Sequence, residues 1–244
     1  MNSTMESHDT AGVDASIARG EIELWFARLD RTDVEIAPMR AMLSADETAR
    51  AARFFQDRDR NRFIVARATL RKLLAAYVGC AAESVRFDYS RWGKPAIAAG
   101  FAPRDIRFNL SHSNGFAVYA IACNREVGVD AETVRPGFAS ERIAEHFFSR
   151  QEVRALRSLP PNQQSEAFFN CWTRKEAYVK ARGEGLAIEL ASFDVSLKPG
   201  EPAAILRAAD RAKWALVAFR PDSERVAAVA IEGSAGRISS PRWL

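Results

Sequence analysis

The sequence predicts an α+β protein built from two successive blocks, each containing helices and extended segments. Helical spacing of apolar residues follows two serine-led capping boxes, which are typical of helix starts. Segments that favour extended structure are bounded by glycine, proline and asparagine, which are typical of turns. No linker rich in proline, glycine or serine separates the blocks. We therefore expect two tightly packed halves, although they show no obvious sequence repeat.

The first block covers residues 21–127 and follows a tail at 1–20 that we expect to be flexible. Ser44 and Glu47 have the spacing of a capping box, in which two side chains satisfy free backbone N–H groups at a helix start. Asn114-Gly115 between two extended runs is typical of a hairpin. The expected elements are, in order, a strand at 21–29, helical segments at 49–55 and 62–78 ending at Gly79, a strand at 85–89, a turn at 92–95, and strands at 106–110 and 116–122.

The second block covers residues 128–244 and begins within a strand predicted at 126–132. A second capping box, formed by Ser149 and Glu152, opens a short helix that stops before Pro160-Pro161. The remaining expected elements are a long helix at 163–182 ending at Gly183, and strands at 193–197, 214–219 and 226–231.

The composition is that of an ordinary globular protein: of 244 residues, 48% are hydrophobic and 27% charged. The three cysteines are far apart and have no zinc or disulfide spacing, so we expect them to be reduced. The N-terminus lacks the apolar core of a secretory signal, and the longest uncharged stretch, 108–124, is too polar to span a membrane. We therefore expect a cytoplasmic protein without a membrane partner. The net charge of +4 favours anionic partners without choosing among them.

Three carboxylates form the first candidate site. Asp130 and Glu132 are two residues apart on a predicted strand, so both point to the same side. Trp172, Glu176 and Lys180 are spaced to share one face of the long helix. Taken alone, these patterns also describe a polar strand face and a surface ion pair. The surrounding helix is apolar and aromatic, however, which favours a cleft, and carboxylates without His or Cys nearby favour Mg²⁺ over zinc or copper.

Two further segments are candidates for binding phosphate. His112 lies within Asn109-Leu-Ser-His-Ser-Asn-Gly115, whose small residues leave backbone N–H groups open to an anion. A hydrogen-bonded loop histidine is the alternative interpretation. Lys94 is held on a stiff Gly-Lys-Pro turn, and Lys94, Lys175 and Lys180 all fall within these motifs. This clustering favours a site for a phosphorylated ligand.

Taken together, these segments resemble the 4′-phosphopantetheinyl transferases of the Sfp type. The order and spacing match over about residues 21 to 232, and the ordered set is highly specific although each piece alone is weak. The N-terminal tail and the last dozen residues match no motif. The matching stretches are Trp92-Gly-Lys-Pro95, Phe108-Asn-Leu-Ser-His-Ser-Asn-Gly115, Val127-Gly-Val-Asp-Ala-Glu132 and Cys171-Trp-Thr-Arg-Lys-Glu-Ala-Tyr-Val-Lys180.

The resemblance implies an enzyme that transfers the phosphopantetheine arm of coenzyme A to a serine of an apo acyl, peptidyl or polyketide carrier protein. Transfer would depend on Mg²⁺ and release 3′,5′-ADP, and secondary metabolism, such as non-ribosomal peptide, siderophore or polyketide synthesis, is the expected setting. The resemblance also implies a monomeric α+β pseudodimer of two similar α/β halves with the active site at their interface. The first half would contact coenzyme A, and the second would supply the metal ligands and the catalytic helix.

The resemblance also implies roles for individual residues. Asp130, Glu132 and Glu176 match the Mg²⁺ ligands, and Glu176 also fits the general base. Lys180 would contact the phosphate that stays with the transferred arm, and His112 completes the catalytic group. The implied contacts to coenzyme A are Lys180, Ser111 and His112 at the phosphates, Gly93, Lys94 and Pro95 at the adenine and nearby phosphates, and the less closely matched Arg58 and Arg67 at the 3′-phosphate.

Two alternatives belong to other functional classes. A basic nucleic-acid-binding protein would explain the many arginines, but not three carboxylates at these spacings, and the sequence contains no recognised nucleic-acid motif. We therefore expect no nucleic-acid partner. A catalytically inactive coenzyme A-binding protein of the same fold is the second alternative, and nothing supports it because all three acids and Lys180 are present.

Overall fold

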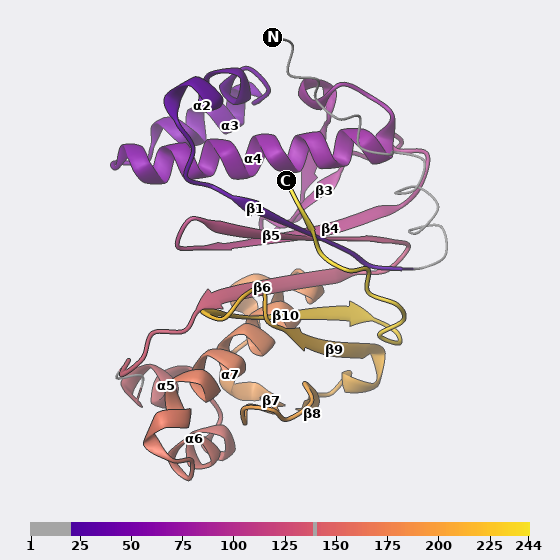
Figure 1. Cartoon of the computed structure of the whole chain (residues 1–244). Coiled ribbons are helices and arrows are strands. Elements are labelled where there is room, and N and C mark those ends of the chain that lie inside the picture. The colour runs from indigo at the N-terminus through magenta and orange to yellow at the C-terminus, as the bar shows by residue number, and fades with distance from the viewer. Residues whose placement is uncertain (1–20, 139–140) are drawn as a thin grey trace.

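A long helix, a sheet, a second sheet and a second long helix lie on one another in a computed structural model that describes residues 21–138 and 141–244 (Figure 1). The tail expected at 1–20 lies outside the described residues. The elements of the first half are β1 (Glu23–Arg28), α2 (Asp33–Arg40), α3 (Ala45–Ala52), α4 (Asp57–Val78), β2 (Phe87–Tyr89), β3 (Pro95–Ile97), β4 (Ile106–Ser113) and β5 (Phe116–Cys123).

The second half repeats this order of elements. In the part of the chain that the structure describes, each half has a first strand, three helices, a short hairpin and a final pair of strands. The elements are β6 (Val127–Thr133), α5 (Glu141–Phe147), α6 (Arg150–Arg157), α7 (Pro161–Arg182), β7 (Asp194–Val195), β8 (Ile205–Arg207), β9 (Trp214–Phe219) and β10 (Arg225–Glu232).

The two sheets also share one topology. The last strand of each half lies between the other two, giving the orders β1-β5-β4 and β6-β10-β9 with antiparallel neighbours. Both long helices, α4 and α7, have 22 residues and end at a glycine in the left-handed conformation, Gly79 and Gly183. The predicted pseudodimer of two similar α/β halves is therefore confirmed.

An equivalent buried ion pair joins two helices in each half. Glu47 of α3 accepts a hydrogen bond from Nε of Arg71 at 2.6 Å, and Glu152 of α6 lies 2.8 Å from Nζ of Lys175. Arg71 and Lys175 hold the same position in α4 and α7, counted from the first residue of each helix. Both glutamates are the third helical residues of the predicted capping boxes. Each one therefore caps the beginning of its own short helix and also forms the ion pair to the long helix.

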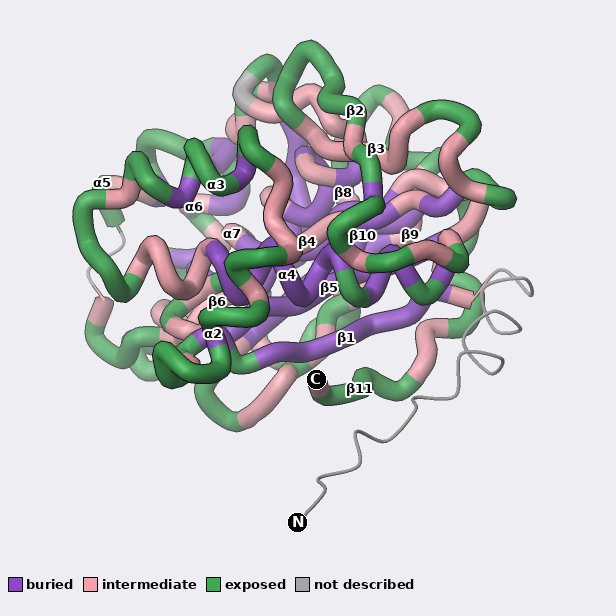
Figure 2. Tube along the Cα trace, turned by 90° about the horizontal axis from the view of Figure 1, so that it is seen from above, coloured by how far each residue is buried: buried purple, intermediate pink, exposed green. Residues whose placement is uncertain are grey.

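The sheets pack face to face through apolar side chains that alternate along the strands, as the two-residue period of a strand requires. The opposite face of each sheet packs on its long helix. Strand β1 is buried along most of its length (Figure 2). Branched and aromatic members of the core between the sheets include Ile22, Leu24, Phe26, Phe116, Val118, Val127, Val129, Val229 and Ile231.

The end of the chain returns to the first half. Strand β11 (Arg242–Trp243) pairs in parallel with β1 at the edge of the first sheet. The Trp243 ring contacts Phe26 and Phe116 at centroid distances of 5.5 and 5.9 Å. The last residues, which match no motif, thus cover an edge that would otherwise be exposed.

Most predicted elements appear with shifted ends. The hairpin at Asn114-Gly115 has a two-residue loop with both residues at positive φ, 46° and 75°. Helix α4 begins at Asp57, five residues before the predicted start, because its first turn is polar and carries no apolar period. Helices α2 and α5 and strands β3, β8 and β11 were not predicted, because segments of two to eight residues carry too little periodicity. None of the helices in the described ranges has the length and apolar character needed to cross a bilayer.

Helix α7 approaches β6 most closely at Gly128. A Cβ atom at this residue would lie 2.2 Å from the Ala177 carbonyl oxygen and 2.2 Å from the Ala181 nitrogen. Both neighbours are backbone atoms of the helix, so neither can rotate away. Glycine is therefore the residue that permits this packing.

We expect Gly128→Ala to lower the free energy of unfolding by at least about 3 kcal/mol, because the helix must move away from the sheet. Gly79→Ala is the control: its Cβ has open space, and only its positive φ is unfavourable, at about 1–2 kcal/mol. Urea unfolding of both variants would measure the difference. An unchanged midpoint for Gly128→Ala would contradict the close approach.

Candidate active site

Two cavities lie on either side of the turn at 92–95. The first, about 340 Å³, is lined by residues of α3, α4 and β4, among them Arg50, Arg67 and His112. The second, about 480 Å³, extends from the turn to α7 and includes Glu176 and Lys180. Gly93, Pro95 and Asn109 line both cavities. A ligand that fills both would therefore pass beside this turn.

The three predicted carboxylates come together where β6 faces α7. Nζ of Lys180 lies 2.6 Å from Oδ1 of Asp130, and the Asp130 side chain is buried. Glu132 follows on the same side of β6, and Glu176 lies one turn before Lys180 on α7. The direct contact between the predicted strand and helix positions is thus the Asp130–Lys180 bond, and the roles of the three carboxylates stay predictions. Trp172 packs instead among the aromatic rings of Phe147 and Phe168, at centroid distances of 5.6 and 6.1 Å.

The carboxylates are close enough to influence one another electrostatically. Burial raises the pKa of Glu176, and the negative charge of Asp130 raises it further. Burial likewise raises the pKa of Glu132, although a hydrogen bond from Ser113 opposes this effect. Like charges held together in a poorly solvated place favour either protonation or a bound cation.

The donor set fits a hard cation. All candidate ligand atoms are carboxylate oxygens, and Oδ2 of Asp130 is buried without a hydrogen-bond partner. Across residues 21–138 and 141–244, no three His, Cys, Asp or Glu side chains form a ready-made metal cluster. In the structure the ammonium of Lys180 forms an ion pair with Asp130. For a cation to bind Asp130, the Lys180 side chain would therefore have to rotate away from this carboxylate.

Strand β4 supports these carboxylates from the first half. Ser111 donates to Oδ1 of Asp130 at 2.7 Å, and Ser113 donates to Oε2 of Glu132 at 2.7 Å. Asn109 accepts a hydrogen bond from the backbone N–H of Val129 at 3.0 Å. Every second residue of β4 from Asn109 to Ser113 thus forms a hydrogen bond to β6, and these bonds join the two halves. The Ser111 hydroxyl faces Asp130 and Lys180, so its contact with coenzyme A stays a prediction.

The wall of the first cavity contains two arginines and one histidine: Arg50, Arg67 and His112. Burial lowers the pKa of His112, and the positive charge of Lys180 lowers it further, so the ring is neutral near pH 7. The guanidinium of Arg67 is hydrogen-bonded to Glu47 and to the Tyr89 hydroxyl. Arg50 lies 5.3 Å from the centroid of the Phe63 ring. Arg50 was not predicted as a site residue, although its spacing of four residues from Asp46 on one helix indicates that both side chains share a face.

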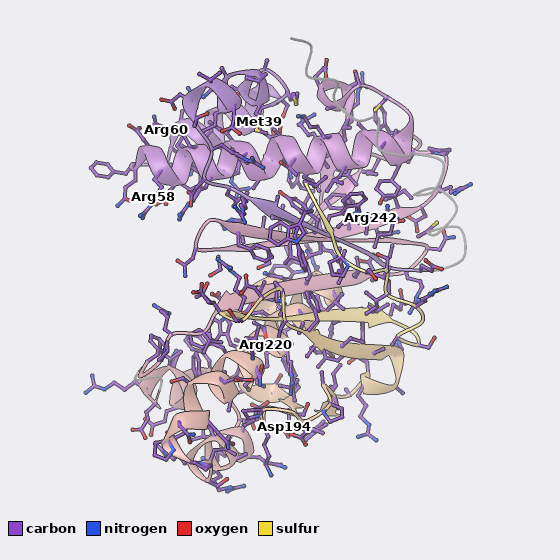
Figure 3. All side chains as sticks on the ribbon, in the orientation of Figure 1. Met39, Arg58, Arg60, Asp194, Arg220 and Arg242 are labelled. Carbon is purple, nitrogen blue, oxygen red and sulfur yellow. The ribbon has the colours of Figure 1, made fainter. Side chains whose placement is uncertain are left out.

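Arg58 lies away from both cavities, whereas Lys94 lines the second but directs its ammonium elsewhere. Arg58 projects from the beginning of α4 (Figure 3), where it lines a separate surface hollow with Arg31 and Asp30. Its role at a 3′-phosphate stays a prediction. The backbone of Lys94 belongs to the turn between the cavities, but its ammonium points into the boundary between the halves and bonds to Glu126.

Comparison with known proteins identifies related sequences for both halves. Residues 30–124 match the family model described as 4′-phosphopantetheinyl transferase, N-terminal, and residues 126–230 match the 4′-phosphopantetheinyl transferase superfamily. The 4′-phosphopantetheinyl transferase HetI of Nostoc sp. is 41% identical over 213 residues, which cover 87% of this chain and 88% of the relative.

Two relatives from Bacillus subtilis match smaller parts of the chain. A 4′-phosphopantetheinyl transferase is 34% identical, with 66% of this chain and 69% of the relative covered. The 4′-phosphopantetheinyl transferase Sfp of strain 168 is 29% identical, with 64% of this chain and 67% of the relative covered.

The buried Glu47 pair beneath the first cavity predicts a pH dependence of stability. Burial alone would raise the pKa of Glu47, but the hydrogen bond from Arg71 and the charge of Arg67 outweigh it and hold the pKa below its ordinary value of 4.5. A lowered pKa in the folded state stabilises the fold above pH 4.5, and this contribution disappears as the pH falls through the folded value.

We therefore expect Glu47→Gln to lower the free energy of unfolding at pH 7 by about 3–5 kcal/mol, because two buried arginines lose their counter-charge. Between about pH 5 and pH 3 its stability should change less than that of the unaltered protein. Urea unfolding at several pH values measures both effects, with the exposed Glu224→Gln as control. Identical pH profiles for Glu47→Gln and the unaltered protein would contradict the assignment.

Proposed function

The chain belongs to the 4′-phosphopantetheinyl transferase superfamily, and on this basis we propose that it transfers the phosphopantetheine arm of coenzyme A to a serine of an apo carrier protein, with 3′,5′-ADP as the other product. One observation of the site carries the proposal. Asp130 of β6 bonds to Lys180 of α7, and Lys180 and Glu176 line the second of two cavities that share one wall. A long ligand with a reactive pyrophosphate at its middle suits this arrangement.

Mg²⁺ would be held by Asp130, Glu132 and Glu176. The unpartnered Oδ2 of Asp130 and the all-oxygen donor set support this assignment. When bound, the cation offsets the repulsion between these carboxylates and the pyrophosphate, and it stabilises charge on the leaving phosphate. Ser111 and Ser113 orient two of the ligands, so residues of both halves contribute to the site.

Coenzyme A would lie across the shared wall. Its adenosine and 3′-phosphate suit the first cavity, where Arg50 and Arg67 supply positive charge and His112 supplies a hydrogen-bonding ring. The arm suits the second cavity, whose outer part is lined by Trp92, Phe147 and other apolar side chains. Gly93 and Asn109, which line both cavities, would then lie near the pyrophosphate.

Glu176 is the proposed general base. In the proposed transfer it accepts the proton of the carrier serine, directly or through a water, while the serine oxygen forms a bond to the phosphorus of the arm. The phosphoanhydride bond breaks, and its electron pair leaves with 3′,5′-ADP. Burial, followed by the charge of Asp130, raises the pKa of Glu176, and a bound cation would oppose both effects. Lys180 would contact the phosphate that moves with the arm.

The setting is proposed by analogy with the relatives. We propose an acyl, peptidyl or polyketide carrier protein as acceptor, and secondary metabolism as the pathway class. The net charge of +4 would favour an acidic acceptor. We further propose a cytoplasmic monomer that acts without nucleic acid or membrane.

We expect purified protein, coenzyme A and Mg²⁺ to add the mass of one phosphopantetheine arm to an apo carrier protein, because the cation must join the acidic site to the pyrophosphate. Intact-mass spectrometry of one peptidyl and one fatty-acid carrier, each with and without EDTA, measures this gain. A gain that survives EDTA would contradict the role of the cation. Failure to bind coenzyme A would contradict the proposed function itself.

We expect Glu176→Gln to lower kcat by about 10²–10⁴-fold with coenzyme A still bound, because the amide cannot accept the serine proton. Glu189→Gln is the matched control, since Glu189 lines the same cavity but lies outside the carboxylate group. Stopped assays of carrier modification give kcat, and calorimetry gives coenzyme A affinity. Near-normal kcat in Glu176→Gln would remove this residue from the base role.

A further inference from the structure

The ammonium of Lys94 is bound where the beginning of β6 meets the end of α7. Its Nζ donates to Oε2 of Glu126 at 2.7 Å, to the Ala181 carbonyl at 2.9 Å and to the Val127 carbonyl at 3.3 Å. The lysine itself lies in the first half, on the turn that links β2 and β3. This side chain therefore bridges the two halves with all three of its donor hydrogens in use.

The end of α7 is suited to receive this cation. The last carbonyls of a helix have no partner within the helix, and the helix dipole places negative charge there. Ala181 belongs to the last turn of the 22-residue helix α7. The lysine stem passes directly over the helix end, because a Cβ at Gly183 would lie 2.9 Å from Cδ of Lys94. The left-handed glycine thus both ends α7 and leaves room for the stem.

The same turn forms the wall between the cavities. Gly93 and Pro95, the neighbours of Lys94, line both of them. The turn is ordered internally by Ser90, whose hydroxyl accepts from the backbone N–H groups of Trp92 and Lys94. It is anchored outwardly by the contacts of Lys94. Loss of that anchor would free the wall to move relative to α7, which carries Glu176 and Lys180.

We propose that Lys94 is a positioning residue, which fixes the shared wall of the coenzyme A site by binding Glu126 and the end of α7 rather than by contacting phosphate. Its side chain is 17% exposed, and its ammonium is held by oxygen atoms of Glu126, Val127 and Ala181. Glu126 lines neither of the two cavities, although with Lys94 and Arg107 it lines a third, of about 360 Å³, beside the same turn. The inference rests on the proposed binding of coenzyme A, which it deepens.

Glu126 makes the two roles of Lys94 distinguishable. If Lys94 contacted phosphate, Glu126→Gln would release a competing carboxylate, and coenzyme A affinity would rise or stay the same. If Lys94 positions the wall, Glu126→Gln and Lys94→Met both remove the ion pair that anchors the turn. Each single variant should then weaken coenzyme A binding by about tenfold, and the double variant should bind no more weakly than the weaker single variant.

Isothermal titration calorimetry with coenzyme A, without carrier, tests this cycle, and thermal unfolding checks that each variant is folded. Kinetics should show a raised KM for coenzyme A with kcat and the carrier KM unchanged. Arg107→Gln is the matched control, because Arg107 binds Oε1 of Glu126 at 2.8 Å without touching Lys94. It should retain normal affinity, as should the exposed-lysine variant Lys198→Met.

Unchanged or tighter coenzyme A binding by a folded Glu126→Gln variant would overturn the positioning role, as would additive losses in the double variant. If the unaltered protein does not bind coenzyme A, the proposed function fails instead. The two failures are therefore separate outcomes of one experiment.

Discussion

Helix α7 lies so close to β6 that a methyl group at Gly128 would meet the helix backbone. This distance determines the site, because Glu176 and Lys180 on the helix must reach Asp130 and Glu132 on the strand. A helix one side chain farther from the sheet would separate the two groups of charges. The small residue is thus required in the same strand that carries the acids, two positions before the first of them. The close contact between Gly128 and the backbone of α7 thus determines both how the second half packs and how its charged site is assembled.

The two halves have the same fold but no recognisable sequence similarity. What they share is physical: a helix of the same length on a sheet of the same order, and a buried glutamate held by a cation at the same position of that helix. Arginine in one half and lysine in the other both supply the positive charge that the buried glutamate needs, so the residue type differs while the ion pair is the same. Each glutamate is also fixed by its capping box, which limits where the short helix can lie. Such constraints leave most surface positions free to diverge.

Local chemistry allowed much of this structure to be predicted. The left-handed glycines at 79 and 183 end both long helices where the sequence predicts, and the alternation of a strand places Asp130 and Glu132 on one side. Features set by tertiary contacts were not predictable in this way. Arg50 and Arg58 are equally plausible cations in the sequence, yet only Arg50 reaches the first cavity. Strand β11 is two residues long, and its pairing depends on an edge of β1 distant in the sequence.

The lysines show why residue type alone does not define a phosphate site. Lys175 is fully buried against Glu152, and Lys94 is committed to the boundary between the halves, so the charge of both is used within the fold. Lys180 differs, because it lines the second cavity itself and its side chain is 28% exposed. A bound cation would compete for its partner carboxylate, Asp130, and leave the ammonium to an incoming phosphate. Of the three lysines in the motifs, we therefore propose Lys180 as the one that contacts the substrate, and Arg50 of the first cavity as a further source of positive charge.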